Sequence, residues 1–248
     1  MRKSLLGGLF VALSMSGFAQ AADLPPAFKA APPPAPIFSW TGFYVGVHVG
    51  AGWTTTEWRS IDFIGVPPFN MGTGSVSGFL GGAQVGINYQ VDVMVFGVEA
   101  DFSWADLSGQ TCSAVAGAVT CNSKADRFAT LTARFGIAAT DHALLYIKGG
   151  GAWLRDTDTI TTLGPLAENS VSTNRSGWTA GGGVEYALPR NWSAKLEYDF
   201  MEFGTHRLLF DLTPVGNGLA NFDAKQRVQV VKFGLNYRFG YGPVVANY

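Results

Sequence analysis

The sequence predicts an all-β fold: an eight-stranded antiparallel transmembrane β-barrel with up-and-down (meander) connections, preceded by a signal peptide and an Ala/Pro-rich linker. Three observations support this prediction. Only 14% of the 248 residues are charged although 47% are hydrophobic, and soluble globular domains carry roughly 25% charged residues. No run of about 18 apolar residues could form a membrane-spanning helix. Between Trp40 and Phe239, apolar and polar positions alternate with a period of two, which is typical of strands with two different faces.

The charge balance excludes one class of partner. Seventeen basic residues face eighteen acidic ones, so the formal net charge is −1. A protein that binds nucleic acid through its phosphates needs a basic surface, and this composition does not provide one. We therefore expect no nucleic-acid partner.

The N-terminal residues 1–21 have the three parts of a secretory signal peptide. Arg2 and Lys3 supply the positive charge, residues 5–13 form the apolar core, and residues 19–21 (Ala-Gln-Ala) form a cleavage site of small side chains. The apolar stretch is too short for a membrane helix. We expect the mature protein to be exported.

The segments on either side of the barrel have a different composition. Residues 22–39 contain six of the twelve prolines, interleaved with alanine, and such a sequence favours an extended, semi-rigid periplasmic linker. Residues 40–239 form the predicted barrel. Residues 240–248 follow the last strand as a periplasmic tail, because Pro243 cannot donate to a strand ladder.

The apolar face of each predicted strand contains no charged residue. In the first strand this face carries Phe43, Val45, Val47 and Val49, and in the last it carries Val231, Phe233, Leu235, Tyr237 and Phe239. A Lys or Arg at the middle of a bilayer costs about 2–4 kcal/mol, which explains this absence if the face contacts lipid. The sheet must then close on itself, because lipid offers no hydrogen-bond partner to a strand edge.

The opposite faces carry charges of both signs, five of each. We predict a lumen charge network formed by Glu99, Asp101, Arg134, Lys148, Glu185, Lys195, Glu197, Asp199, Lys232 and Arg238. Buried charges have to be paired, and equal numbers allow this. The network could fill the barrel or line an ion path. We favour filling, because an eight-stranded barrel has room inside only for side chains.

The expected connections alternate in length. Short turns are predicted near residues 90–93, 140–142 and 188–191, and long loops at 55–75, 106–125, 157–175 and 204–224. This alternation is typical of outer-membrane barrels, with long extracellular loops and periplasmic termini. We therefore expect the protein in the outer membrane of a Gram-negative cell.

Several segments resemble a known family. They are residues 38–46 (FSWTGFYVG), 148–153 (KGGGAW), 178–186 (WTAGGGVEY) and 233–239 (FGLNYRF). Together with the signal peptide and the Ala/Pro-rich stretch, they are similar to the small porin-family outer-membrane barrels of alphaproteobacteria, which are related to the membrane domain of OmpA. The resemblance implies a structural envelope component and surface antigen that presents four extracellular loops.

The same resemblance implies two partners, outer-membrane lipid and the barrel assembly machinery, which reads a final aromatic residue. We expect Tyr237 and Phe239 to form that assembly signal, although nine residues follow them. Two alternative functions stay open: a narrow channel for small solutes, and binding of a ligand such as haem, or of a host factor, by the loops. The loop sequences identify no partner.

Candidate residues for chemistry are few. No two of the three histidines, His48, His142 and His206, are spaced as a metal-ligand pair, and none is followed two residues later by the serine that lipid-deacylating barrels use. We expect no catalytic residue, no metal site, no cofactor and no enzymatic activity.

The two cysteines, Cys112 and Cys121, both lie in the second predicted long loop. Thiols so placed in an oxidising compartment normally pair, so we predict a disulfide, with free thiols as the alternative. The cross-link would stiffen an exposed loop. For a loop this short it would stabilise the folded state by about 2–3 kcal/mol.

Overall fold

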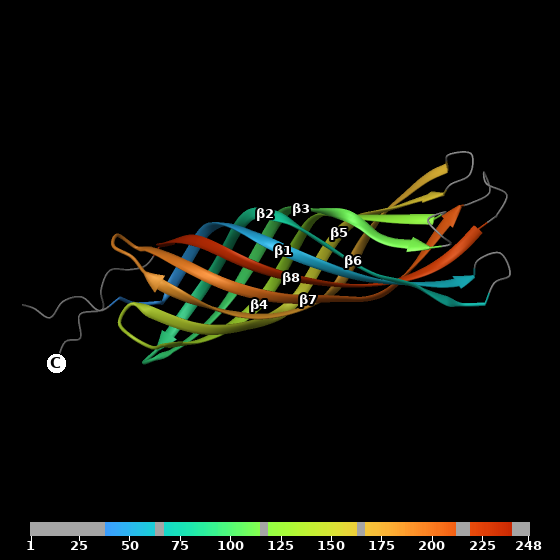
Figure 1. Cartoon of the computed structure of the whole chain (residues 1–248). Helices are drawn as coiled ribbons and strands as arrows, with labels where there is room; N and C mark the ends of the chain where they lie inside the picture. Colours follow the sequence, from blue (N-terminus) through green and yellow to red (C-terminus); the bar gives the residue numbers. More distant parts are fainter. Residues whose placement is uncertain (1–37, 63–66, 115–118, 163–166, 212–218, 240–248) are drawn as a thin grey trace, which may run out of the picture. The chain divides into compact units, whose positions relative to one another are not determined.

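A computed structural model describes residues 38–62, 67–114, 119–162, 167–211 and 219–239. These residues form eight strands: β1 (Gly42–Asp62), β2 (Phe69–Val91), β3 (Met94–Ala114), β4 (Val119–Ala138), β5 (Ala143–Thr162), β6 (Ala167–Ala187), β7 (Trp192–Asp211) and β8 (Leu219–Phe239). Each strand pairs antiparallel with the next, and β1 also pairs with β8, which closes the ring (Figure 1). The predicted fold class is confirmed. The predicted signal peptide, the linker up to residue 37 and the tail 240–248 lie outside the described residues.

The strand faces follow the predicted alternation. Leu196 is 53% exposed, whereas its neighbours Lys195 and Glu197 are each 1% exposed. Phe79, on another outward face, is 81% exposed. Apolar side chains therefore cover the outside, and the charged side chains of these strands enter the lumen, the reverse of a soluble barrel. Among the described residues, no helix is long and apolar enough to cross a membrane.

Glycines on the inward faces leave room for large side chains in a narrow lumen. A Cβ atom added at Gly86 would overlap the hydroxyl and ring of Tyr44, and Tyr44 is fully buried. Gly86 thus allows the Tyr44 ring to lie across the barrel, where its hydroxyl reaches the charged residues of the lumen.

The three short turns are confirmed. β2 ends at Val91 and β3 starts at Met94, and the other two turns fill residues 139–142 and 188–191. Asp92, Arg190 and Asn191 have positive φ angles of 52°, 62° and 65°. Asp and Asn tolerate this left-handed conformation better than most residues.

The predicted extent of the four long loops was wrong. Every strand is 20 to 23 residues long, twice the length needed to span a bilayer. Most of residues 55–75, 106–125, 157–175 and 204–224 continue the strands, and Thr55 lies in β1 opposite Ser75. The polar segments keep the period of two, and their backbone groups pair with each other. The ladder therefore does not need to end where the lipid ends.

Beyond the lipid-facing zone the barrel divides into two four-stranded sheets. The β2–β3 pairing stops at Gly78 and Leu107, and the β6–β7 pairing stops at Trp178 and Glu202. β3 to β6 continue together as one sheet, and β7, β8, β1 and β2 continue as the other (right side of Figure 1). Register shifts in β3, β4 and β7 lie near this division, where bulges increase the local twist.

Candidate functional site in the barrel lumen

The ten predicted lumen charges all point into the barrel. None of them is more than 5% exposed, and each has a partner of opposite charge. They come from β3, β4, β5, β6, β7 and β8. The inward positions of six strands therefore meet in one network.

Lys148 on β5 is the most connected cation. Its Nζ lies 2.7 Å from Oε1 of Glu197, 3.2 Å from Oε1 of Glu99, 3.3 Å from Oδ2 of Asp101 and 3.5 Å from Oδ1 of Asp199. These carboxylates come from β3 and β7, neither of which is next to β5 in the ladder. The contacts therefore cross the lumen.

Two further lysines complete the compensation of these acids. Nζ of Lys232 lies 2.7 Å from Oδ2 of Asp199 and 2.8 Å from Oε1 of Glu197. Nζ of Lys195 lies 3.0 Å from Oε2 of Glu99. Charges that are this deeply buried are stable only when paired and hydrogen-bonded.

Arg134 links the network to the periplasmic half of the lumen. Its Nη2 lies 2.8 Å from Oε2 of Glu185 and its Nη1 lies 3.3 Å from Oε2 of Glu99. Nη1 also donates to the hydroxyl of Tyr44 at 2.6 Å, and that hydroxyl donates to Oε2 of Glu99 at 2.8 Å. The guanidinium stacks 3.9 Å from the ring centroid of Tyr146. The two tyrosines were missed, because an apolar ring on the polar face gives no charge signal.

A triple oxygen site could in principle hold a cation. Carboxylate oxygens of Glu99, Asp101 and Glu197 lie within 4.8 Å of one another. Nζ of Lys148 contacts all three residues. The ammonium group therefore occupies the position that a metal ion would need, and the residues do not fit a metal site.

His48 and Ser103 form a buried pair in the lumen. Nε2 of His48 lies 2.9 Å from Oγ of Ser103, and Nδ1 lies 2.6 Å from Oε1 of Gln84. Because Nε2 of Gln84 donates to Asn236, its Oε1 has to accept, so Nδ1 of His48 carries the proton and Nε2 accepts from Ser103. His48 is 3% exposed and Ser103 0%. Both ring nitrogens are engaged, so neither is free to bind haem iron.

An apolar layer fills the lumen on the extracellular side of the charges. Its buried residues are Leu80, Leu107, Ala125, Phe128, Ala152, Leu154, Met201, Phe203, Val228 and Val230. We did not predict this layer, since the inward face was expected to be small or polar. Adjacent apolar pairs such as Phe79-Leu80 and Trp153-Leu154, one outward and one inward, are the sequence signal that could have revealed it.

A second polar cluster lies beyond the apolar layer. Nε of Arg175 is 3.0 Å from Oδ2 of Asp156, and Nη2 is 2.7 Å from Oδ2 of Asp158. Oγ of Ser123 donates to Asp158 at 2.6 Å. Burial, together with the neighbouring Asp158, raises the pKa of Asp156 to about 7, against the opposing effect of Arg175. Asp156 and Asp158 follow Lys148 on β5 at even spacing and therefore share its inward face. Extending the predicted strand beyond Trp153 would have found both aspartates.

The periplasmic end of the lumen is closed by the segment before β1. Trp40 is 1% exposed and packs with Val95, Leu144, Tyr146 and Ala187. Its backbone N–H donates to Oε1 of Gln90 at 2.7 Å. The guanidinium of Arg238 lies 4.7 Å from the Trp40 ring centroid. Trp40, the first residue of the predicted barrel segment, therefore fills the periplasmic mouth of the barrel.

One protein-family model matches nearly the whole chain. The model described as the outer membrane protein beta-barrel domain matches residues 9–239. The chain belongs to this family. It is a protein of the outer membrane of a Gram-negative bacterium, and lipid surrounds its barrel.

Named relatives cover almost the whole chain. The 31 kDa outer-membrane immunogenic protein of Brucella melitensis is 31% identical over 92% of this chain and 97% of its own length. The 25 kDa outer-membrane immunogenic protein of Brucella abortus is 28% identical over 96% of this chain and 98% of its own length. The outer-membrane protease OmpT of Escherichia coli shares the fold, with a TM-score of 0.51 and 10% identity over 80% of this chain and 97% of its own.

The remaining predicted site residues lie at the two ends of this family's barrel. Cys112 on β3 is directly opposite Cys121 on β4, and Cys121 is buried and disulfide-bonded. The cysteines therefore lie on strand extensions and not in a loop. Tyr237 and Phe239 lie at the C-terminal end of β8, with their ring centroids 5.0 Å apart. His142 is exposed in a turn, where it stacks on Tyr186, and His206 lies on β7.

Proposed function

We propose that this family member is a structural component and surface antigen of the outer membrane, a sealed barrel that anchors two extracellular sheets. The observation that supports this most directly is the Lys148–Glu197 contact of 2.7 Å, which crosses the lumen. Apolar layers on either side of it add two further seals. A path for solutes would require all three to rearrange.

The extracellular sheets support the second half of this proposal. They are continuous with the membrane barrel, and polar contacts link them: Trp58 of β1 donates to Thr111 of β3 at 3.1 Å, and Arg175 of β6 donates to the carbonyl of Ala224 in β8 at 3.3 Å. A rigid extension of this kind presents its connections to the surroundings of the cell. The names of the Brucella relatives, which describe them as immunogenic, agree with exposure to an immune system.

We also infer that the barrel has no catalytic role. The Ser103–His48 pair resembles a nucleophile with its base, which is the arrangement that hydrolases need. Both residues are buried in the lumen, so a lipid or peptide substrate has no access to Oγ of Ser103. The test is covalent labelling with a fluorophosphonate, and labelling of Ser103 in the folded protein would overturn the inference.

Single-channel recording in a planar bilayer tests the main proposal. We expect protein purified from outer membranes to give no stable conductance steps, with a general porin as the positive control in the same bilayer. Regular open steps would overturn the sealed-barrel proposal in favour of a narrow solute channel. Steps that appear only in the Lys148→Ala variant would support it, because they would show that the network closes the bore.

A further inference from the structure

Two arginines stand side by side on the outer wall of the barrel. Arg127 on β4 and Arg155 on β5 are direct partners in the strand register, and both are exposed. Directly opposite residues have Cβ atoms about 4.5–5.5 Å apart, and like charges at this spacing repel. An anion held between the two guanidinium groups would relieve this repulsion.

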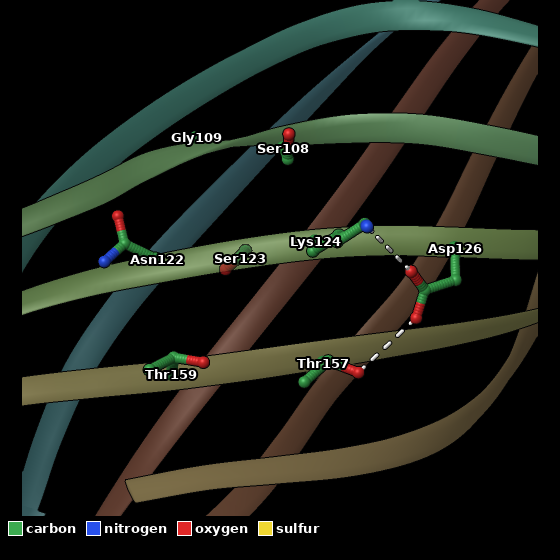
Figure 2. Close-up of a pocket in the computed structure, with 8 residues that line it drawn as sticks. All are labelled: Ser108, Gly109, Asn122, Ser123, Lys124, Asp126, Thr157 and Thr159. Atoms are coloured by element: carbon green, nitrogen blue, oxygen red, sulfur yellow. Dashed lines mark hydrogen bonds and ion pairs between the residues drawn. The ribbon is translucent and has the colours of Figure 1, made fainter. Parts of the chain in front are cut away.

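The described part of the chain provides no carboxylate for either arginine. Asp126, next to Arg127 in sequence, is engaged elsewhere: its Oδ1 lies 3.7 Å from Nζ of Lys124, and its Oδ2 accepts from Oγ1 of Thr157 at 3.4 Å (Figure 2). Asp106 on β3 lies 3.9 Å from the same lysine. The acids of this wall therefore pair with Lys124 and leave the two arginines uncompensated.

The opposite wall differs in this respect. Arg207 lies 3.2 Å from Asp223, and Arg227 lies 3.0 Å from Glu57. These arginines also point outward beyond the lipid-facing zone, on β7 and β8. The missing counter-charge is therefore not shared by every outward arginine at this height, since Arg207 and Arg227 are both paired.

The arginine pair borders the apolar band. In the register, Trp104 of β3 is opposite Arg127, and one rung closer to the membrane centre lie Phe102 and Trp153. An open groove of about 480 Å³ joins Arg127 and Arg155 to Phe102 and Trp153. Cationic groups therefore meet exposed aromatic rings at the level where lipid headgroups begin.

We propose that Arg127 and Arg155 bind the phosphate of a phosphorylated glycolipid in the outer leaflet, whose acyl chains lie along Phe102 and Trp153. Guanidinium groups bind phosphate oxygens with two parallel hydrogen bonds, so two arginines can hold one phosphate between them. The apolar rings below favour a lipid-borne phosphate over a free one. The site rests on the place of the barrel in the outer membrane and does not depend on whether its lumen is sealed.

Native mass spectrometry with bis-phosphorylated lipid A in detergent tests the site. We compare the full-length exported protein with Arg127→Gln/Arg155→Gln, and with the matched control Arg207→Gln/Arg227→Gln, which removes the same charge from the opposite wall. Loss of a charged hydrogen bond predicts about a tenfold weaker retention for each arginine of the site, and no more than about twofold for the control pair.

Further arms separate the sources of phosphate. The wild type should retain dephosphorylated lipid A as weakly as the double variant retains the phosphorylated form. Inorganic phosphate should not displace lipid A from the wild type. Equal retention of lipid A by wild type and double variant would overturn the proposal, and so would full displacement by inorganic phosphate. If the double variant does not fold, each single variant is measured instead, and unchanged retention in both would likewise overturn it. Channel recordings should be identical for all variants, so this test is independent of the proposed function.

Discussion

Lys148 of β5 and Glu197 of β7 meet across the lumen, with 2.7 Å between Nζ and Oε1, although β6 separates their strands in the ladder. Both side chains are fully buried. An ion pair inside a protein contributes little net stability, but removal of one partner leaves an uncompensated charge. The pair therefore makes the barrel sensitive to single substitutions at its centre.

Replacing Lys148 with Met should destabilise the barrel by about 3–5 kcal/mol, because four carboxylates lose a shared cation. Urea unfolding of protein refolded into lipid vesicles measures this change. Arg207→Met is the control: Arg207 is paired with Asp223 but largely exposed, and exposed pairs contribute about 0–1 kcal/mol. Equal losses for the two variants would show that the lumen pairs are no more important than surface pairs.

Replacing Leu196 with Arg should impair membrane insertion, by about 2–4 kcal/mol if the position lies near the middle of the bilayer. Leu196 is 53% exposed on the outer face of β7, and Val98→Arg on β3 should behave in the same way. Thr55→Lys is the control, since Thr55 lies beyond the apolar band on β1. Normal folding of Leu196→Arg into vesicles would mean that this face does not contact lipid.

The predicted disulfide should be present in protein taken from outer membranes. Cys112 and Cys121 are directly opposite in the β3–β4 register, a position from which a disulfide forms without backbone movement. Non-reducing mass spectrometry should find both thiols blocked and the mass lower by two hydrogens. Cys121→Ser should still fold, because the cross-link lies outside the lipid-spanning zone. Free, alkylatable Cys112 would contradict the prediction.

The extracellular end of β5 should become less stable as the pH rises. The folded pKa of Asp156 is about 7, above its ordinary value of 3.8, so the folded state holds this proton more tightly than the unfolded state does. The resulting stabilisation is full below about pH 3.8 and is lost as the pH rises through 7. Hydrogen exchange is measured for the amides of β5 after Trp153 and for those of β6 before its partner Ser176. After correction for intrinsic rates, these amides should show more opening at pH 8 than at pH 5. Asp156→Asn should remove this difference, and a difference that persists would exclude Asp156 as its source.

The assembly signal should be internal. Phe239 is in register with Phe43 of β1, and the nine residues after it fall outside the described part of the chain. Deletion of residues 240–248 should therefore leave outer-membrane levels unchanged, whereas Phe239→Ala should lower them, as measured by immunoblot of membrane fractions. Normal levels for Phe239→Ala together with loss for Tyr248→Ala would show that the machinery reads the chain end.

The period-two alternation by itself determined the number of strands, their outward faces and the direction of the lumen charges. Leu196 and Lys195 show why. Successive residues of a strand point to opposite sides of the sheet, so the side that carries the apolar residues is the side that contacts lipid. The short turns were readable because the gaps between alternating segments are short there, and the structure places Asp92 and Asn191 in left-handed backbone at two of them.

Only the tertiary structure decided which charges meet and where the strands end. The contact between Lys148 and Glu197 depends on the register of β5, β6 and β7 and on the tilt of the strands around the barrel, and neither is written in one strand's sequence. The split at Gly78 and Trp178 depends on which neighbour each strand follows beyond the membrane. Pairing between strands is a non-local choice, because both neighbours offer the same backbone hydrogen bonds, and packing of the whole sheet selects between them.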